Sequence, residues 1–374
     1  MESNLKRIGD YIEQTDIRNE NLSVNTLLGV SIEKKFIPSI ANTVGTDFTK
    51  YKVVEKGQFA YGPVTSRNGD KLSIALLKDY DKCIISSSYI PFRITKPNEL
   101  NAEYLMLIFS NPEFDRYARY NSWGSAREIF SWEELCDTKI SIPDIKEQEK
   151  IVREYNTITK RIDILNQIND NLLNLLEKYT TNNIDYNRDK RCLKEIGHIQ
   201  GGYAFKSSDF KDIRTHNKIF KIKNIGENEV DIENTQYVDD SVIKKLDKKF
   251  RLFSGNVIVA MTGAELGKTG FLYGSDYNYY LNQRVGLVVG DDEKKELYLN
   301  CLFLTKKFQN VIYEKGYGSA QANISSDDIE QIEIVIPTDD ELRAFNSFAI
   351  HIYKNLIKNS EEKHQLLKLR NFIF

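Results

Sequence analysis

Cysteine and histidine are scarce in this chain, with four of each among 374 residues. The cysteines form no Cys-x-x-Cys pair and the histidines are dispersed, so no zinc site is expected. Scattered single cysteines are typical of a reduced, cytoplasmic protein. No run of about 18 apolar residues is present that could serve as a membrane span. The opening residues MESNLKRIGDYIEQ lack the apolar part of a secretory signal, and we therefore expect a cytoplasmic location.

An excess of either charge is absent as well, since the formal net charge is −2 at pH 7. This value neither indicates nor excludes nucleic-acid binding, because a DNA-binding protein can gather lysine and arginine on one face. Hydrophobic residues make up 41% and charged residues 28%, which is the balance of a globular protein. The length allows two domains that each bury a core.

Enzyme motifs are incomplete. Residues 261–269, MTGAELGKT, resemble a phosphate-binding loop, but three residues instead of four separate the glycines and no helical pattern follows. Residues 111–114, NPEF, resemble a methyltransferase tetrapeptide, but a helix start capped by Asn111 explains them better. Residues 291–295, DDEKK, contain a nuclease-like Glu-x-Lys and fit a charged turn. Because no Gly-x-Ser-x-Gly occurs either, we predict no catalytic residue and no metal ligand.

An internal repeat is the strongest feature of the sequence. Residues 124–143 read GSAREIFSWEELCDTKISIP and residues 318–337 read GSAQANISSDDIEQIEIVIP, at a constant offset of 194. Residues 6–9 and 55–59 correspond more loosely to 194–197 and 253–257. Each half contains strand-like segments followed by helical ones, which indicates an α+β domain.

A long amphipathic helix is expected after each Ile-Pro. In the first helix the apolar positions are spaced alternately by four and three residues, which is the pattern of a coiled-coil seam. The second helix repeats the pattern at an offset of 190, and one helical turn fewer leaves the same face inward. The predicted seam consists of Ile151, Tyr155, Ile158, Ile162, Leu165, Asn169, Leu172, Leu176 and Tyr179, with Phe345, Phe348, Ile352, Asn359, Leu366 and Leu369.

The sequence therefore predicts two similar α+β domains separated by two long helices that form an antiparallel coiled coil. The predicted bounds are 1–145 for the first domain, 146–182 for the central helix, 183–337 for the second domain and 338–374 for the C-terminal helix. An amphipathic helix is often part of a globular core. Here the two helices end the two halves and match one another, which favours a coiled coil.

The ordered motifs resemble the type I restriction specificity subunit family over nearly the whole chain. In the second half they are GNVIV at 255–259, TGA at 262–264, NQRVG at 282–286 and GSAQ at 318–321. In the first half, GQF at 57–59 and SSYIPF at 87–92 resemble another variant of the recognition domain. At the start of the first long helix, Glu147-Gln148 and Ile151-Val152 resemble the conserved start of the family's spacer helix. At the start of the second long helix, residues 340–342 depart from that pattern.

The resemblance implies that each half is a target recognition domain that reads one part of a split DNA site. It also implies binding of two modification (methyltransferase) subunits, and of restriction (translocase and endonuclease) subunits in the full complex. No cofactor is then expected in this chain, since S-adenosylmethionine, ATP and Mg would belong to the partner subunits.

Candidate DNA-contacting residues are polar, guanidinium or aromatic side chains in predicted loops. In the first domain they are Tyr61, Arg67, Asn68, Lys71, Trp123, Ser125 and Arg127. In the second domain they are Thr262, Lys268, Gln283, Arg284, Tyr317, Ser319, Gln321 and Asn323.

Two other functions stay open at this point. The chain could be a coiled-coil scaffold or adaptor without a DNA function, or a diverged DNA methyltransferase or nuclease. A scaffold without a DNA function would show no sequence-dependent binding of duplex DNA. An enzyme would be supported by tight binding of S-adenosylmethionine to the isolated chain.

Overall fold

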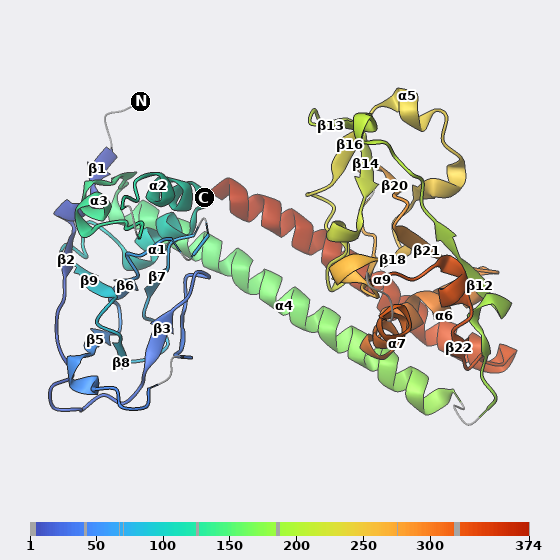
Figure 1. Ribbon diagram of the computed structural model, residues 1–374, viewed down its shortest axis with the longest axis horizontal. Coiled ribbons are helices and arrows are strands. Elements are labelled where there is room, and N and C mark those ends of the chain that lie inside the picture. Colours follow the sequence, from blue (N-terminus) through green and yellow to red (C-terminus); the bar gives the residue numbers. More distant parts are fainter. Residues whose placement is uncertain are drawn as a thin grey trace. The chain divides into compact units, whose positions relative to one another are not determined.

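The computed structural model describes residues 5–40, 43–66, 68–69, 71–124, 127–184, 188–274, 276–317 and 322–373. The chain forms two compact units, Met1–Thr159 with Leu369–Phe374, and Lys160–Lys368. Helix α4 (Ile145–Asn183) contributes residues to both units (Figure 1). The division falls inside this helix, so the domain bounds expected from the sequence stay a prediction.

The first unit mixes short strands with three helices before α4. Its elements are β1 (Leu5–Arg7), β2 (Ile12–Gln14), β3 (Leu28–Val30), β4 (Phe36–Pro38), β5 (Lys52–Glu55), β6 (Phe59–Tyr61), β7 (Ile74–Leu76), β8 (Lys82–Ile85), β9 (Ile90–Ile94), α1 (Ala102–Ser110), α2 (Pro112–Tyr120), α3 (Trp132–Asp137) and β10 (Lys139–Ser141).

The second unit follows the same plan with more strands. Its elements are β11 (Arg191–Cys192), β12 (Gly197–Gly201), β13 (Phe210–Lys211), β14 (Asn217–Phe220), β15 (Asn228–Glu229), β16 (Gln236–Val238), α5 (Asp240–Ile243), β17 (Arg251–Leu252), β18 (Val257–Ala260), β19 (Thr269–Phe271), β20 (Asn278–Leu281), β21 (Val285–Gly290), α6 (Glu293–Phe303), α7 (Lys306–Gly316), α8 (Ser326–Glu330), β22 (Glu333–Ile334) and α9 (Asp339–Ile373).

The sheet topology confirms the internal repeat. The first unit has an antiparallel sheet of order β2-β9-β6-β7, and the second has β12-β21-β18-β19 in the same antiparallel order, with β15 added in parallel to β19. In each unit a strand near its start pairs with the strand before the long helix, as β1-β10 and β11-β22. Three helices lie between equivalent strands of each unit, so both halves are α+β domains of one plan.

Local sequence signals explain the equivalent turns and caps. Gly57 and Gly255 adopt φ of +85° and +91°, a conformation that glycine tolerates best. The side chains of Gln58 and Asn256 each accept a hydrogen bond from the backbone three residues earlier. Asn111 caps α2 by accepting from the backbone N–H of Glu113, as expected, with Pro112 as the first helical residue.

The two units differ mainly in their outer sheets. The first has the pairs β3-β4 and β5-β8, whereas the second has five strands of order β13-β16-β14-β20-β17, in which β14 and β20 are parallel. An isolated parallel bridge between Leu27 and Ile84 is the counterpart of β14-β20 in the first unit. Elaboration of the outer sheet therefore distinguishes the second domain.

The antiparallel packing of α4 and α9 is confirmed within the second unit. Arg161 pairs with Glu362, Asn169 contacts Asn359, and Tyr179 stacks on Phe348 with ring centroids 4.1 Å apart. Partner numbers fall along α9 as they rise along α4, which defines the antiparallel direction.

The predicted seam positions differ in burial. Those buried are Ile158, Ile162, Leu165, Asn169, Leu176, Phe345 and Ile352, and those partly buried are Ile151, Tyr155, Leu172, Tyr179, Phe348, Asn359 and Leu366. Leu369 is 48% exposed, so its place on the seam was wrong. Helix α9 also buries Leu342, Ala349 and Leu356 because the core of the second domain packs on it.

His364 on α9 is buried and makes stability depend on pH. Its Nε2 lies 3.0 Å from Glu233, and Lys218, Lys368 and Asp276 are the other charged groups that act on it. Burial is the largest influence and lowers the pKa of His364; Lys368 and Lys218 also lower it, whereas Glu233 and Asp276 raise it. We therefore treat the contact with Glu233 as a hydrogen bond donated by the neutral ring.

We predict that the free energy of unfolding falls as the pH drops through the ordinary histidine pKa of about 6.5. The unfolded chain takes up a proton there that folded His364 does not bind, so stability is lost on the acid side. Denaturant titrations at several pH values give the free energy of unfolding at each pH. This free energy should change less with pH in His364→Gln than in the wild-type chain. If the free energy of unfolding depends on pH equally in the variant and the wild-type chain, His364 is not the group responsible.

Candidate nucleic-acid interface

Three loops of the second unit meet at one end of its first sheet. The backbone N–H of Met261 donates to Arg284 at 3.2 Å, and the N–H of Ile324 donates to Met261 at 2.9 Å. An isolated bridge joins Thr262 to Asn323. The structure therefore brings together candidate residues that lie about 20 to 60 positions apart in the chain, as closure of a sheet edge by neighbouring loops requires.

The first unit forms the equivalent cluster. Val64 bridges Ile129, which stands 194 positions before Asn323. The N–H of Phe130 donates to Pro63 at 2.8 Å, the counterpart of the bond from Ile324 to Met261. Trp123, which also bridges Ile129, and Tyr317 occupy equivalent positions and are 65% and 66% exposed. Each domain thus presents an exposed aromatic ring beside the same pair of loops.

The candidate side chains of the first unit have distinct environments. Arg127 is exposed and, within the part of the chain that the structure describes, has no ion-pair partner. Lys71 is exposed and pairs with Glu33 at 2.7 Å. Asn68 donates to the carbonyl of Val64 and the hydroxyl of Ser73, so it stabilises its own loop. Two further candidates, Arg67 and Ser125, lie outside the described residues.

The second unit presents a similar set. Gln283 and Arg284 are exposed, and Arg284 makes no ion pair among the described residues. Lys268 pairs with Glu265, and Tyr317 stacks on Tyr313 with centroids 5.1 Å apart. The remaining exposed candidate is Asn323. Two others, Ser319 and Gln321, lie outside the described residues.

Two predicted contacts are corrected by burial. Tyr61 is fully buried in the first core, and burial raises the pKa of its hydroxyl far above the ordinary value. Thr262 is 6% exposed, although its backbone belongs to the loop cluster. Both were wrong as direct DNA contacts, because Tyr61 belongs to the core of the first unit and the side chain of Thr262 is buried.

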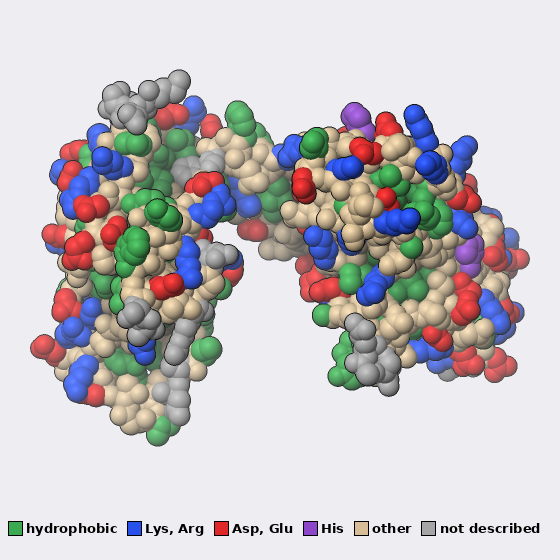
Figure 2. Space-filling view, turned by 45° about the horizontal axis from the view of Figure 1, so that its top comes forward, with side chains coloured by type: hydrophobic (Ala, Val, Ile, Leu, Met, Phe, Trp, Pro, Cys, Tyr) green, Lys and Arg blue, Asp and Glu red, His purple; other side chains and the backbone are tan. Residues whose placement is uncertain are grey.

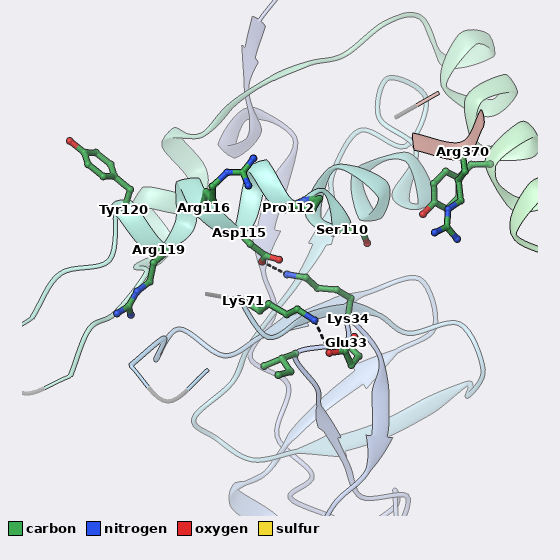
Figure 3. Close-up of a pocket in the computed structure, with 12 residues that line it drawn as sticks. Glu33, Lys34, Lys71, Ser110, Pro112, Asp115, Arg116, Arg119, Tyr120 and Arg370 are labelled. Carbon is green, nitrogen blue, oxygen red and sulfur yellow. Dashed lines mark hydrogen bonds and ion pairs between the residues drawn. The ribbon is translucent and has the colours of Figure 1, made fainter. Parts of the chain in front are cut away.

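A hollow of about 1000 Å³ on the first unit was not anticipated (Figure 3). It adjoins candidate Lys71 and adds basic and aromatic side chains from α2. The lining includes Ile32, Glu33, Lys34, Lys71, Ser110, Pro112, Asp115, Arg116, Arg119, Tyr120, Tyr155 and Arg370. The spacing of Arg116 and Arg119, three residues apart on one predicted helix, was the signal available in the sequence.

The base of this hollow is held by a structural ion pair. Lys34 Nζ lies 2.5 Å from Asp115 and 2.7 Å from the carbonyl of Leu72, and Asp115 accepts the N–H of Leu72 (Figure 3). Both charged side chains are nearly buried, and burial lowers the pKa of Lys34 although Asp115 opposes this. The pair ties the β3-β4 turn to α2, and the exposed rim remains for ligand contacts.

Acidic and basic side chains are interspersed on the visible face of each unit, without a continuous basic stripe (Figure 2). Among the described residues, no group of His, Cys, Asp and Glu could hold a metal ion, and no helix is long and apolar enough to cross a membrane.

A family model described as the type I restriction modification DNA specificity domain matches residues 15–174 and 187–368. The chain belongs to this specificity-domain family. Each matched region covers most of one repeated α+β unit together with most of one long helix. No match is found among curated proteins.

One solved structure shows the same fold, and two others are similar to a lower degree. The S subunit of a type I restriction–modification system from M. genitalium is 13% identical, with a TM-score of 0.60 over 99% of this chain and 94% of that one. The HsdS subunit of Thermoanaerobacter tengcongensis is 14% identical, with a TM-score of 0.37 over 100% and 96%. A chain from a study of type I complex assembly has 14% identity and a TM-score of 0.42 over 99% and 95%.

The two specificity domains carry equivalent apolar grooves outside the loop clusters. The groove of the first domain has a volume of about 550 Å³ and that of the second about 150 Å³. Their linings match at the offset of 194: Tyr104 with Tyr298, Ile108 with Leu302, Phe114 with Phe308, Tyr117 with Val311, and Ile140 with Ile334. An apolar lining is therefore retained at equivalent places in halves whose loops differ.

We predict that Asp115→Ala destabilises the first specificity domain by about 3 kcal/mol, because it leaves the nearly buried Lys34 without its carboxylate. Urea denaturation measures the loss. Glu113→Ala, which removes an exposed pair with Arg116 on the same helix, is the control and should leave the midpoint unchanged. Equal effects of the two variants would show that the Lys34–Asp115 pair is dispensable.

Proposed function

We propose that this chain is the DNA-recognition subunit of a type I restriction–modification enzyme, in which each domain reads one half of a bipartite site. The observation that carries the proposal is the pair of equivalent loop clusters, with one framework and different side chains. Trp123 and Tyr317 keep the aromatic character of the clusters, while the neighbouring polar residues differ. Two readers of this kind suit an asymmetric, split sequence.

Arg127 and Arg284 are the strongest candidates for base contacts. An arginine without a carboxylate partner can donate two hydrogen bonds to guanine O6 and N7, or bind a phosphate. Gln283 can pair in the same way with adenine. The paired cations around the hollow, such as Lys71, suit positioning on the DNA backbone better than base reading.

We further propose that the chain itself is not catalytic. Methyl transfer from S-adenosylmethionine, and ATP- and Mg-dependent translocation and cleavage, then reside in modification and restriction subunits of a cytoplasmic complex. Membership of the specificity family supports this assignment. The paired grooves support two copies of the modification subunit, because equivalent surfaces on a repeated framework suit two identical partners.

We predict that Arg127→Ala and Arg284→Ala each impair recognition of one half-site and leave the other intact. Loss of a bidentate contact costs about 1–3 kcal/mol, or roughly tenfold to a hundredfold in discrimination. Competition between duplexes that differ in one half-site, measured on the chain with its modification subunits, separates the two effects. Arg93→Ala, an exposed arginine paired with Glu13 outside the loop cluster, is the control.

The proposal fails if wild-type complexes bind all duplexes alike. If both variants alter recognition of the same half-site, the assignment of one half-site to each domain is wrong. Tight binding of S-adenosylmethionine by the chain alone would favour an enzyme instead.

We predict that Tyr117→Glu and Val311→Glu each reduce the number of bound modification subunits from two to one. Both side chains are partly exposed in equivalent grooves, so a carboxylate should oppose docking of an apolar partner surface. Because Tyr117 also contacts Phe130 of the core, circular dichroism is used to check that its variant is folded. Native mass spectrometry of the assembled complex counts the subunits. Retention of two copies in both variants would rule out the grooves as docking sites.

A further inference from the structure

A buried polar network crosses the helix pair of the second unit. Asn169 on α4 is 6% exposed, and Ser360 on α9 is fully buried. The Nδ2 of Asn359 donates to Oδ1 of Asn169 at 2.8 Å. The two asparagines that interrupt the apolar pattern at matching places in the two helices therefore bond to each other.

Glu229 on β15 inserts its carboxylate into this seam. Its Oε1 accepts hydrogen bonds from the hydroxyl of Ser360 at 2.7 Å and from Nδ2 of Asn169 at 3.2 Å. Its Oε2 pairs with Lys363, which also contacts Asn166 at 3.1 Å. The side chains of Glu229 and Lys363 are only 18% and 16% exposed, so these partners replace most of the water around the carboxylate.

The backbone of the second domain fixes the place of this carboxylate. Strand β15 pairs in parallel with β19, where Glu229 stands opposite Phe271. A Cβ on Gly270 would lie 2.8 Å from the carbonyl of Glu229, so glycine permits the close approach. The side chain of Asn228, at φ +64°, accepts a hydrogen bond from Gln309. The position of Glu229 is therefore fixed by the sheet and would stay the same if α4 moved along its axis.

Helix α9 has further polar attachments to the same domain. Glu361 accepts the backbone N–H of Gly274, and His364 bonds to Glu233. Among the described residues of α4 inside the second unit, those bonded to Glu229 or to its partner Lys363 are Asn169 and Asn166. Asn169 and Asn166 thus connect α4 to the buried carboxylate of β15, in addition to the ion pair of Arg161 with Glu362 on α9.

Apolar packing alone would leave the register of α4 against the domain ambiguous. Ile162, Asn169 and Leu176 are spaced by seven residues and occupy the same heptad position. Movement of α4 by one heptad would place Ile162 or Leu176 against Glu229 and leave its carboxylate without the amide partner. A buried asparagine at such a position is a known means of fixing register.

We propose that Asn169, Ser360 and Glu229 set the register of α4 against the second recognition domain and thereby select the number of unread base pairs between the half-sites. The link to DNA spacing rests on the proposed function. One heptad is about 10.5 Å of helix, or about three base pairs. Asn169 and its partners act as positioning residues, since none of them is placed in a DNA-contacting loop.

The register is tested on the full-length chain with cysteine pairs and a bismaleimide cross-linker. Arg161→Cys with Glu362→Cys reports the native register, because these side chains are ion-paired. Arg161→Cys with Asn355→Cys reports a shift of one heptad. With Asn169→Leu we expect the second pair to cross-link at least tenfold more than in the background with Asn169. Asn174→Leu, at an exposed position of α4, is the matched control and should show no increase.

Circular dichroism confirms that each variant is folded before cross-linking. If Asn169→Leu lowers the folded fraction, Ser360→Ala removes a single hydroxyl from the network and should give the same shifted product at a lower level. A native cross-link alone in both folded variants overturns the proposal.

The consequence for DNA is tested by mapping methylation in cells that express the variant with its modification subunits. We expect Asn169→Leu to add methylated sites whose spacer differs by about three base pairs, with both half-sites unchanged. A shifted cross-link with an unaltered spacer overturns the link to spacing. Absence of sequence-dependent methylation with the wild-type chain refutes the proposed function instead, and cross-linking still decides the register.

Discussion

Burial of the apolar face of α9 is the interaction on which the second half of the molecule depends. Phe345, Ala349 and Leu356 are nearly or fully buried, and they belong to the same core as the central strands of the second domain. The helix is therefore both one partner of the coiled coil and a wall of the domain core. This dual use keeps the domain attached to the helix pair, because separating them would expose the core to water.

The repeated framework and the loops at its ends have different roles. The repeated sheets and helices supply equivalent supports, and the loops at their ends differ in side chains. Among the described residues, Arg127 and Arg284 are exposed and have no carboxylate partner, whereas Lys34 and Asp115 pair with each other and hold α2. Paired, nearly buried charges thus stabilise the support, while free exposed guanidinium groups remain available to a ligand.

The sequence was sufficient to predict the repeat, the two helices and the equivalent places of Asn169 and Asn359 on their seam, because these follow from a constant offset and from heptad spacing. The hydrogen bond between the two asparagines was not predicted. Ser131 and Ser325, matched in the repeat, both cap helices. The five-stranded outer sheet could not be predicted, since β13 and β17 have only two residues each and β14-β20 is a parallel contact between distant segments. Loop residues were identified as a group, but Tyr61 was misplaced because it is the last residue of β6, a strand that is buried along its whole length.

On the proposed function, the two domains of this chain read separate parts of one DNA site. Methylation mapping in cells that express the wild-type chain with its cognate modification subunits tests it most directly. We expect a single motif made of two specified segments, separated by a stretch of fixed length in which every base is accepted. A continuous motif without such a stretch, or methylation that ignores sequence, would contradict it.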